Sequence, residues 1–237
     1  MKRLHFLRHG QAAHNVRAEQ MRTLGCTFQE FLDTMAQDDA FDAPLTQLGL
    51  EQAHEQQVRA RDLEVDMIVA SPLSRAIDTA EIVFPPSRAC RRVIREEWRE
   101  VNGMLLNAQR LSRTELSRKY PLWSELTLDM DDDGLWSPQL ETTAACAERA
   151  YNGLCWLWEA NEANIAIAAH GGIFSYLLNE HECVTASPSL RHRFHNCEIR
   201  SCTLTCVVAS ADDRLHFELR ACEGEFVGDA ILSGRPT

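Results

Sequence analysis

Short apolar runs alternate along this chain with longer segments in which apolar residues recur every three or four positions. The short runs are typical of buried strands, and the longer spacing is typical of helices that pack on a sheet. We expect strands over 2–8, 65–70, 89–94 and 164–169, helices over 46–63, 71–83, 141–159 and 173–179, and a closing antiparallel hairpin over 197–209 and 214–221. This alternation predicts an α/β fold with a largely parallel sheet that carries helices on both faces.

Two long segments interrupt the alternation. Residues 11–43 are polar, with a weak helical pattern over 27–36, and residues 95–139 show no regular pattern. The second segment is too long for a plain connection, so we expect it to cover a site. No linker divides the chain, and we therefore predict one domain over 1–237 with a cap-like insertion around 100–139.

Composition narrows the range of partners. The formal net charge of −11 disfavours nucleic acid and acidic membranes. No run reaches the roughly 18 apolar residues that a membrane span needs. The nine cysteines include no Cys-x-x-Cys pair, and we interpret Cys202 and Cys206, on one face of a predicted strand, as buried thiols rather than metal ligands. We expect a cytoplasmic protein without nucleic-acid or membrane partners.

Two of the predicted strands end in histidine. Arg8-His9-Gly10 follows the strand over 2–8, and His170-Gly171-Gly172 follows the strand over 164–169. The carboxyl ends of parallel strands meet at one edge of a sheet, where open α/β folds bind ligands. A neutral imidazole can attack phosphorus, and a guanidinium matches phosphate oxygens. Each histidine alone would more often be an ordinary strand-end residue, but the pair predicts a pocket for a phosphoryl group.

Arg75 is predicted to reach the same edge. Ser71 and Pro72 follow the strand over 65–70 and are typical of a helix start, with Ser71 as N-cap and Pro72 in the first turn. This places Arg75 in the first turn, where its guanidinium is available to phosphate. The alternative is a solvent-facing arginine paired with Asp78 or Glu81.

The motifs occur in a characteristic order: Arg-His-Gly at 8–10, Leu-Thr-x-x-Gly at 45–49, Ser-Pro-Leu-x-Arg-Ala-x-x-Thr-Ala at 71–80 and His-Gly-Gly at 170–172. Over roughly residues 3–208 the chain thereby resembles the histidine phosphatase superfamily, the phosphoglycerate mutase-like group. The resemblance implies a three-layer α/β/α sandwich with a mostly parallel central sheet, and a phosphohistidine intermediate formed without a metal or other cofactor. It also implies a nucleophile, His9, and a set of groups around the phosphoryl oxygens: Arg8, Asn15, Arg75 and His170. Gly171 opens the helix after His170, and we expect it to bind phosphate because the amides at a helix N-terminus favour anions.

The family also uses a carboxyl proton donor after the third strand, and Glu96, Glu97 and Glu100 are candidates. Glu100 has a glycine three residues later, as family members often do, so it is preferred and Glu96 is the runner-up. The alternative is that all three belong to a solvated charge run. The acidic run 129–133 lacks the ligand spacing of a calcium loop, and we interpret it as solvated loop rather than as a metal site.

These features predict a phosphomonoester hydrolase that acts on a small phosphorylated metabolite. The alternatives are a phosphoglycerate mutase, a phosphoprotein phosphatase and an inactive module that only binds phosphorylated ligands. Residues 40–49 resemble the plant and fungal phosphatase-like branch, and 16–43 lack the Gly-Trp-x-Asp stretch of mutases, which favours hydrolysis. Residues 191–195 either form a basic rim, suited to a substrate with a second anionic group, or a solvent-facing edge strand.

Overall fold

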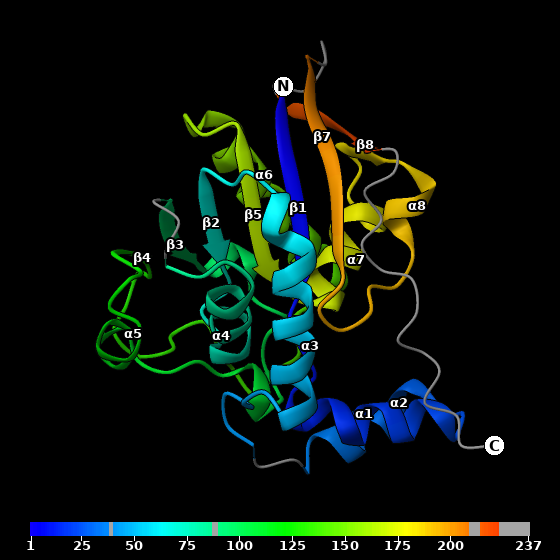
Figure 1. The fold of residues 1–237 in the computed structure, drawn as a ribbon. Coiled ribbons are helices and arrows are strands. Elements are labelled where there is room, and N and C mark those ends of the chain that lie inside the picture. Colours follow the sequence, from blue (N-terminus) through cyan, green and yellow to red (C-terminus); the bar gives the residue numbers. More distant parts are fainter. Residues whose placement is uncertain (38–39, 87–89, 209–213, 223–237) are drawn as a thin grey trace, which may run out of the picture.

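The computed structural model describes residues 1–37, 40–86, 90–208 and 214–222, and its centre is a single twisted sheet (Figure 1). The strands are β1 (Lys2–Arg8), β2 (Met67–Ala70), β3 (Arg91–Arg95), β4 (Glu125–Thr127), β5 (Asn164–Ala169), β6 (Val184–Ala186), β7 (Ile199–Val208) and β8 (Leu215–Ala221). Their spatial order is β4-β3-β2-β5-β1-β7-β8-β6. Only the pairings of β7 with β1 and with β8 are antiparallel. The largely parallel sheet and the closing hairpin are therefore confirmed, while the residues of the hairpin turn lie outside the described ranges.

Helices cover both faces of this sheet. They are α1 (Ala13–Thr23), α2 (Phe28–Met35), α3 (Gln47–Arg59), α4 (Ser74–Val83), α5 (Arg113–Lys119), α6 (Thr143–Glu159), α7 (Gly171–Glu180) and α8 (Pro188–Arg191). One buried cluster joins the sheet to α6 and α7, and a second cluster joins the opposite face to α3, α4 and α5. The three-layer α/β/α architecture is therefore confirmed.

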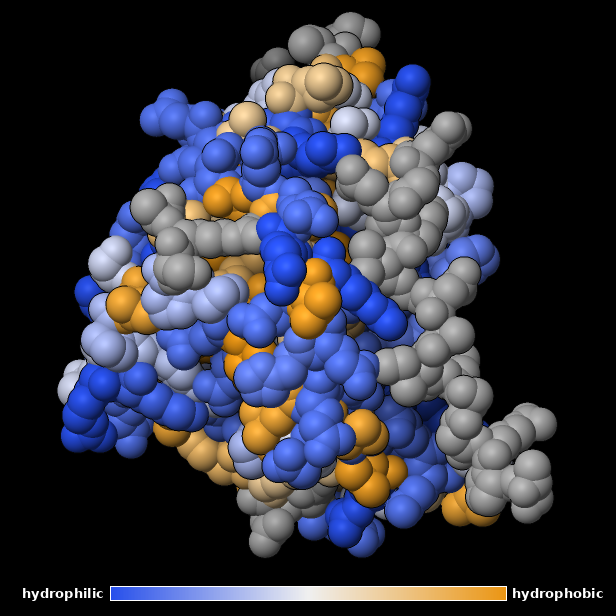
Figure 2. Space-filling model, in the orientation of Figure 1, coloured by the Kyte–Doolittle hydropathy of each residue, from blue (hydrophilic) through white to orange (hydrophobic). Residues whose placement is uncertain are grey.

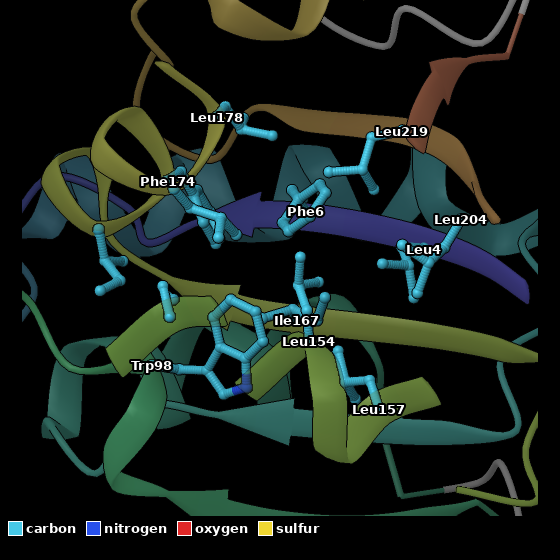
Figure 3. Close-up of a cluster of buried hydrophobic side chains, with 14 of the residues drawn as sticks. Leu4, Phe6, Trp98, Leu154, Leu157, Ile167, Phe174, Leu178, Leu204 and Leu219 are labelled. Atoms are coloured by element: carbon cyan, nitrogen blue, oxygen red, sulfur yellow. The ribbon is translucent and has the colours of Figure 1, made fainter. Parts of the chain in front are cut away.

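Strand β1 shows how the two core clusters are divided. Side chains alternate across a strand, and Leu4 and Phe6 belong to the cluster with α6 and α7, whereas Leu7 belongs to the other. The ring centroid of Phe6 lies 5.0 Å from that of Phe174 and 6.5 Å from that of Trp98. Figure 3 shows these three side chains in the same cluster. Burial of each such side chain stabilises the fold by about 1.5–3 kcal/mol. This packing holds β1, and with it the residues at its carboxyl end.

The surface seen in Figure 2 has no large continuous hydrophobic area. There the region over α3 and α4 is mainly hydrophilic, and hydrophobic residues lie in small separate groups. Among the described residues, no helix combines the length and the hydropathy that crossing a membrane requires. All nine cysteines are free thiols; Cys202 is buried as expected, but Cys206 is only half-buried.

Several elements differ from the expectations. The segment 95–139 is not irregular throughout, because it contributes α5, the edge strand β4 and the 3-10 turns η2 (Glu96–Trp98) and η3 (Leu106–Ala108). Strands of three residues, such as β4 and β6, are too short to show a period. Helix α1 was also unexpected, because its buried positions are His14, Asn15 and Ala18 rather than large apolar residues. Hydrophobic periodicity could not reveal such a helix.

The start of α4 also differs. The helix begins at Ser74 with Leu73 as its N-cap, so the prediction that Ser71 caps it is wrong. The Ser71 hydroxyl instead forms a 2.7 Å hydrogen bond with Nε2 of His170. The same hydroxyl accepts the Leu73 N–H at 3.3 Å, so Ser71 joins the turn before α4 to a histidine 99 positions away in the chain.

Candidate active site

The parallel pairing of β1 with β5 brings the two histidines together. Arg8 is opposite Ala169 in the sheet register, so both strands end at the same level. The backbone N–H of His9 donates to the carbonyl of Ala169 across this edge at 3.0 Å. The ring centroids of His9 and His170 are 4.9 Å apart, which confirms that the strand ends converge.

The bonding of His9 determines which of its nitrogens is free to react. Nδ1 lies 2.6 Å from the carbonyl oxygen of Gly10, which can only accept, so Nδ1 carries the proton. Nε2 therefore has a lone pair, and it accepts from Nε of Arg75 at 3.3 Å. Burial, followed by the charges of Arg75 and Arg8, holds the pKa of His9 well below its usual value of 6.5. The ring is thus a neutral imidazole with Nε2 facing a guanidinium.

Arg75 is fully buried in the first turn of α4, as predicted for its place in the helix. One of its terminal nitrogens donates to the Asn107 carbonyl at 2.7 Å. The alternative that pairs it with Asp78 or Glu81 is wrong, because those carboxylates accept from Tyr120 and Trp123 instead. Burial lowers the pKa of Arg75 to about 10, so the guanidinium stays charged at neutral pH.

Arg8 is the second guanidinium whose charge acts on both histidines. It donates to the carbonyl of Phe194 at 2.7 Å, and this contact holds its guanidinium against the loop after α8. Its Nε lies 3.4 Å from the place where a Cβ on Gly171 would be, so the glycine leaves room for the guanidinium at the start of α7. Burial, followed by the neighbouring Arg193 guanidinium, lowers the pKa of Arg8 to about 10.

Five of the nine buried side-chain atoms that lack a hydrogen-bond partner among the described residues belong to residues of this site. Within the described part of the chain, five residues near His9 each have one buried side-chain nitrogen without a hydrogen-bond partner: Arg8 (Nε), His14 (Nδ1), Arg75 (a terminal nitrogen), Asn107 (Nδ2) and His170 (Nδ1). A buried polar group left unpaired costs about 1–3 kcal/mol. Guanidinium and amide nitrogens can only donate, so the ligand that satisfies them must offer acceptors. The arrangement is suited to an oxyanion.

His14 and Asn15 extend the cluster from the first turn of α1. Oδ1 of Asn15 accepts from the Ala12 N–H at 3.0 Å, and its Nδ2 donates to Nε2 of His14 at 3.0 Å. His14 therefore carries its proton on Nδ1, the unpartnered atom, and its ring lies 6.0 Å from that of His9. Asn15 is thus bonded to its own chain and orients His14.

The three candidate proton donors have different surroundings. Glu96 accepts from Arg99 and Arg110, and Glu97 is paired with Arg95. The side chain of Glu96 is only 12% exposed, so the solvated charge run is the wrong interpretation for it.

Glu100 has no arginine partner among the described residues. Its carboxylate instead accepts backbone N–H bonds from Gly172 at 3.2 Å and from Ile173 at 3.1 Å, in the first turn of α7. Glu100 is the candidate whose carboxylate is bonded to the turn directly after His170.

The acidic run and the basic segment 191–195 have structural contacts as well. Asp131 accepts from the backbone and hydroxyl of Thr114 at the start of α5. The side chain of Asp133 is only 3% exposed and pairs with Arg99, so the expectation of a solvated loop is wrong for this side chain. Among the described residues, no group of three or more His, Cys, Asp or Glu side chains is placed to hold a metal. The segment 191–195 contains the last residue of α8 and a loop, so the edge-strand alternative is wrong.

Three contributors to the site were missed or misread in the sequence. The side chain of Asn107 and the ring of His14 bring unpaired donors, and Ser71 holds His170. His14 adjoins a recognised motif, which is a weak signal. Asn107 lies in a long segment without a pattern, and nothing in the sequence marks it.

The fold and this cluster define an α/β protein with a candidate active site at the carboxyl edge of its sheet. A family model described as histidine phosphatase superfamily (branch 1) matches residues 4–208, and the chain belongs to that family. It is 30% identical over 235 residues to phosphoglycerate mutase-like protein 1 of Arabidopsis thaliana, covering 84% of this chain and 80% of the relative. It is also 30% identical over 160 residues to a probable phosphoglycerate mutase of Erwinia tasmaniensis, covering 67% and 72%.

Solved structures agree on the fold. The alpha-ribazole phosphatase of Shigella flexneri superposes with a TM-score of 0.57 at 21% identity, covering 86% of this chain and 91% of that one. A mycobacterial glucosyl-3-phosphoglycerate phosphatase, solved with VO3, gives a TM-score of 0.55 at 18% identity, covering 93% and 98%.

Proposed function

We propose that this protein is a phosphomonoester hydrolase that works through a phosphohistidine at His9. The observation that carries the proposal is the set of buried nitrogens that have no hydrogen-bond partner in the described ranges and surround a neutral, buried imidazole. A phosphoryl group seated there offers the oxygen acceptors that these nitrogens lack, and it meets the Nε2 lone pair of His9.

In the first step, Nε2 of His9 attacks phosphorus, a P–N bond forms and the ester P–O bond breaks. Arg8 and Arg75 stabilise the charge on the phosphoryl oxygens, which is the largest requirement of such a transfer. Ser71 accepts from the Leu73 N–H at 3.3 Å, so its own proton is available to Nε2 of His170. That leaves the proton of His170 on Nδ1, where it donates to the phosphoryl group.

Glu100 is the proposed acid and base. It donates a proton to the departing alkoxide, because an alkoxide is a poor leaving group, and this contributes typically ~10²–10⁴-fold. In the second step it takes a proton from water, which attacks phosphorus, breaks the P–N bond and releases inorganic phosphate. The two guanidiniums supply positive charge at the transferring group, so the proposal assigns no metal.

Phosphate release from 4-nitrophenyl phosphate tests the proposal. His9→Ala is expected to lose nearly all turnover, and the exposed His54 on α3 supplies the matched control, His54→Ala, with full activity. Brief mixing with labelled ester is expected to leave acid-labile, alkali-stable phosphate on the wild-type protein alone. Full phosphate release by His9→Ala would overturn the proposal, and binding of phosphate without turnover by the wild-type protein would favour the inactive binding module.

A mutase would use the same groups but return the phosphoryl group to the substrate. Assay on 3-phosphoglycerate separates the two, because the hydrolase releases phosphate and the mutase makes 2-phosphoglycerate without it. We further propose that the substrate carries a second anionic group. The positive charge of Arg193 lies near enough to Arg8 to affect its pKa, and Arg193→Met is expected to raise KM for esters that carry a carboxylate more than for neutral esters. Equal KM changes for both classes would refute this preference.

A further inference from the structure

The segment that presents Glu100 has little regular structure of its own. Strand β3 ends at Arg95, a single 3-10 turn follows over Glu96–Trp98, and Glu100 lies two residues beyond it. A carboxyl group that transfers a proton must be held within a fraction of an ångström of its partner. Its position therefore depends on contacts from other elements.

Arg149, in the middle of α6, makes those contacts. Its two terminal nitrogens donate to four of the five backbone carbonyls over residues 96–100: Glu96 at 3.2 Å, Glu97 at 3.1 Å, Arg99 at 3.0 Å and Glu100 at 3.2 Å. Carbonyls outside a ladder need a donor when they are buried, and here one guanidinium serves all four. The backbone of Glu100 is therefore bonded directly to α6.

Glu141 contacts both Arg149 and the segment that Arg149 holds. It pairs with Arg149 through two hydrogen bonds of 2.9 and 2.7 Å. It also accepts the backbone N–H of Asn102 at 3.0 Å, and its own N–H donates to the Asn102 carbonyl at 2.8 Å. Glu100 thus lies between two residues, Arg99 and Asn102, whose backbones are both held by the same ion pair.

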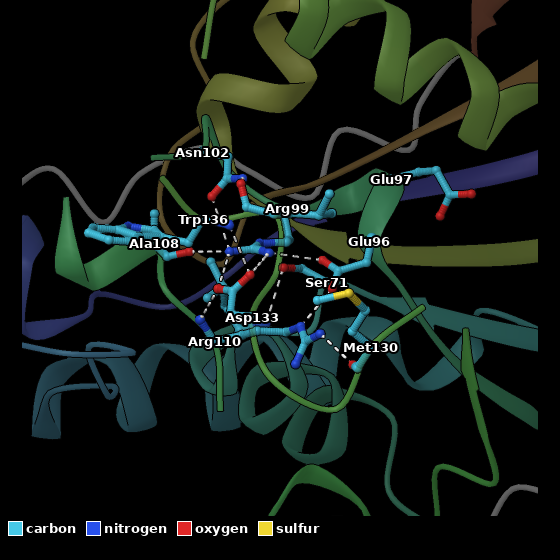
Figure 4. A network of polar contacts seen from close by, with 12 residues as sticks. Ser71, Glu96, Glu97, Arg99, Asn102, Ala108, Arg110, Met130, Asp133 and Trp136 are labelled. Carbon is cyan, nitrogen blue, oxygen red and sulfur yellow. Dashed lines mark hydrogen bonds and ion pairs between the residues drawn. The ribbon is translucent and has the colours of Figure 1, made fainter. Parts of the chain in front are cut away.

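A second arginine holds the opposite side of the segment. Arg99 is almost fully buried, and it donates to Asp133, to Glu96, to the side chain of Asn102 and to the Ala108 carbonyl, as Figure 4 shows. On the α6 side, a Cβ at Gly153 would lie 2.9 Å from the Trp98 ring, so the helix backbone itself packs against the turn. The segment is therefore held from two sides, by Arg149 and α6 on one and by Arg99 on the other.

We propose that Arg149 is a positioning residue that holds the carboxyl group of Glu100 at the start of α7 for proton transfer. The inference rests on the proposed role of Glu100. Lysine at this position would keep the charge opposite Glu141 but would lack the planar fork that reaches several carbonyls at once. The substitution Arg149→Lys is therefore expected to make the position of Glu100 less fixed while the phosphate-binding groups Arg8 and Arg75 remain in place.

The dependence on the leaving group separates positioning from general damage. An alkyl phosphate needs an acid to protonate its leaving oxygen, whereas 4-nitrophenolate leaves without one. We compare kcat/KM for the two esters, since this constant covers the steps up to phosphoryl transfer to His9. Arg149→Lys is expected to lower kcat/KM for the alkyl ester by ~10–100-fold, and for 4-nitrophenyl phosphate by less than about threefold.

Three further variants make the result decisive. Glu100→Gln sets the full size of the leaving-group effect, and Glu141→Gln replaces Arg149→Lys if the latter does not fold. Arg91→Lys is the matched control, because Arg91 is paired with Glu125 and Glu162 and makes no contact with the segment of Glu100.

The possible failures differ from one another. If Arg149→Lys and Glu141→Gln lower both constants equally, or neither, while Glu100→Gln discriminates between the esters, the positioning role is overturned and the proposed function stands. If Glu100→Gln does not discriminate, the assigned acid is wrong and the inference fails with it.

Discussion

Replacement of Gly49 by alanine tests how firmly the backbone after His9 is held. Gly49 is the third residue of α3, where alanine would ordinarily be better than glycine by ~1 kcal/mol. Here a Cβ would lie 2.1 Å from the carbonyl oxygen of Gln11, about 1.3 Å short of the 3.4 Å at which ordinary contact begins. Both groups belong to backbones, so no side-chain rotation relieves the overlap.

The loop around Gln11 is tied down on several sides. The Gln11 carbonyl accepts the Thr46 N–H at 2.9 Å, and the Gly10 N–H donates to the Thr79 hydroxyl at 3.1 Å. Overpacking of this kind costs about 1–3 kcal/mol, which outweighs the gain in helix propensity. Any shift also moves the Gly10 carbonyl that orients His9, and a displacement of ~1 Å at a reacting group costs about 10²-fold in rate.

The measurement is urea unfolding together with phosphate release from 4-nitrophenyl phosphate. Gly134→Ala is the matched control, because its Cβ would lie 2.3 Å from the tip of the exposed, flexible Met130 side chain, which can move aside. Gly49→Ala is expected to be less stable than the control and to lose ~10²-fold in activity. A Gly49→Ala protein with wild-type stability and turnover would refute the reasoning.

Three other outcomes are expected. Asp133→Ala leaves Arg99 without its shortest carboxylate partner and is expected to cost about 3 kcal/mol in urea unfolding; a loss under 1 kcal/mol would contradict it. Burial raises the pKa of Asp42 from its ordinary 3.8 to about 6, so the folded state binds this proton more tightly. The proton on Asp42 therefore contributes about 3 kcal/mol to the free energy of unfolding below pH ~4, and this contribution is lost as the pH rises through ~6. Asp42→Asn is expected to reduce the dependence of the free energy of unfolding on pH over this range. Inorganic phosphate at about 100 times its Kd is expected to raise the free energy of unfolding by ~2.7 kcal/mol, and equal protection of Arg75→Met would argue against the site.

The strand ends were predictable because parallel topology determines where they lie. His9 and His170 each follow an apolar run that forms a strand. When β1 and β5 run in the same direction, both histidines lie at the same edge of the sheet. Arg75 follows from the same rule, since it opens the helix after the neighbouring strand β2. Local patterns of this kind depend on residues adjacent in the chain, and the sequence displays them directly.

Other contributors depended on contacts between distant segments. Serine is a residue type favoured at N-caps, but Ser71 binds a histidine 99 residues away. Asn107 belongs to no recognised motif. The three glutamates after β3 have similar local sequences. Glu96 and Glu97 are bound by arginines, and Glu100 is bound by the amides of α7.

The sequence by itself thus determined the α/β class, the edge of the sheet that carries the chemistry and the imidazole and guanidinium groups that meet there. Hydrophobic period and strand-end residues are encoded locally, so they can be read without coordinates. Only the tertiary structure decided which carboxylate has no ion pair among the described residues, which buried donors lack partners there and what holds Glu100 in place. Those properties arise when α6, α7 and the segment after β3 pack together, and burial gives each unpaired or paired group an energetic weight that it lacks in the extended chain.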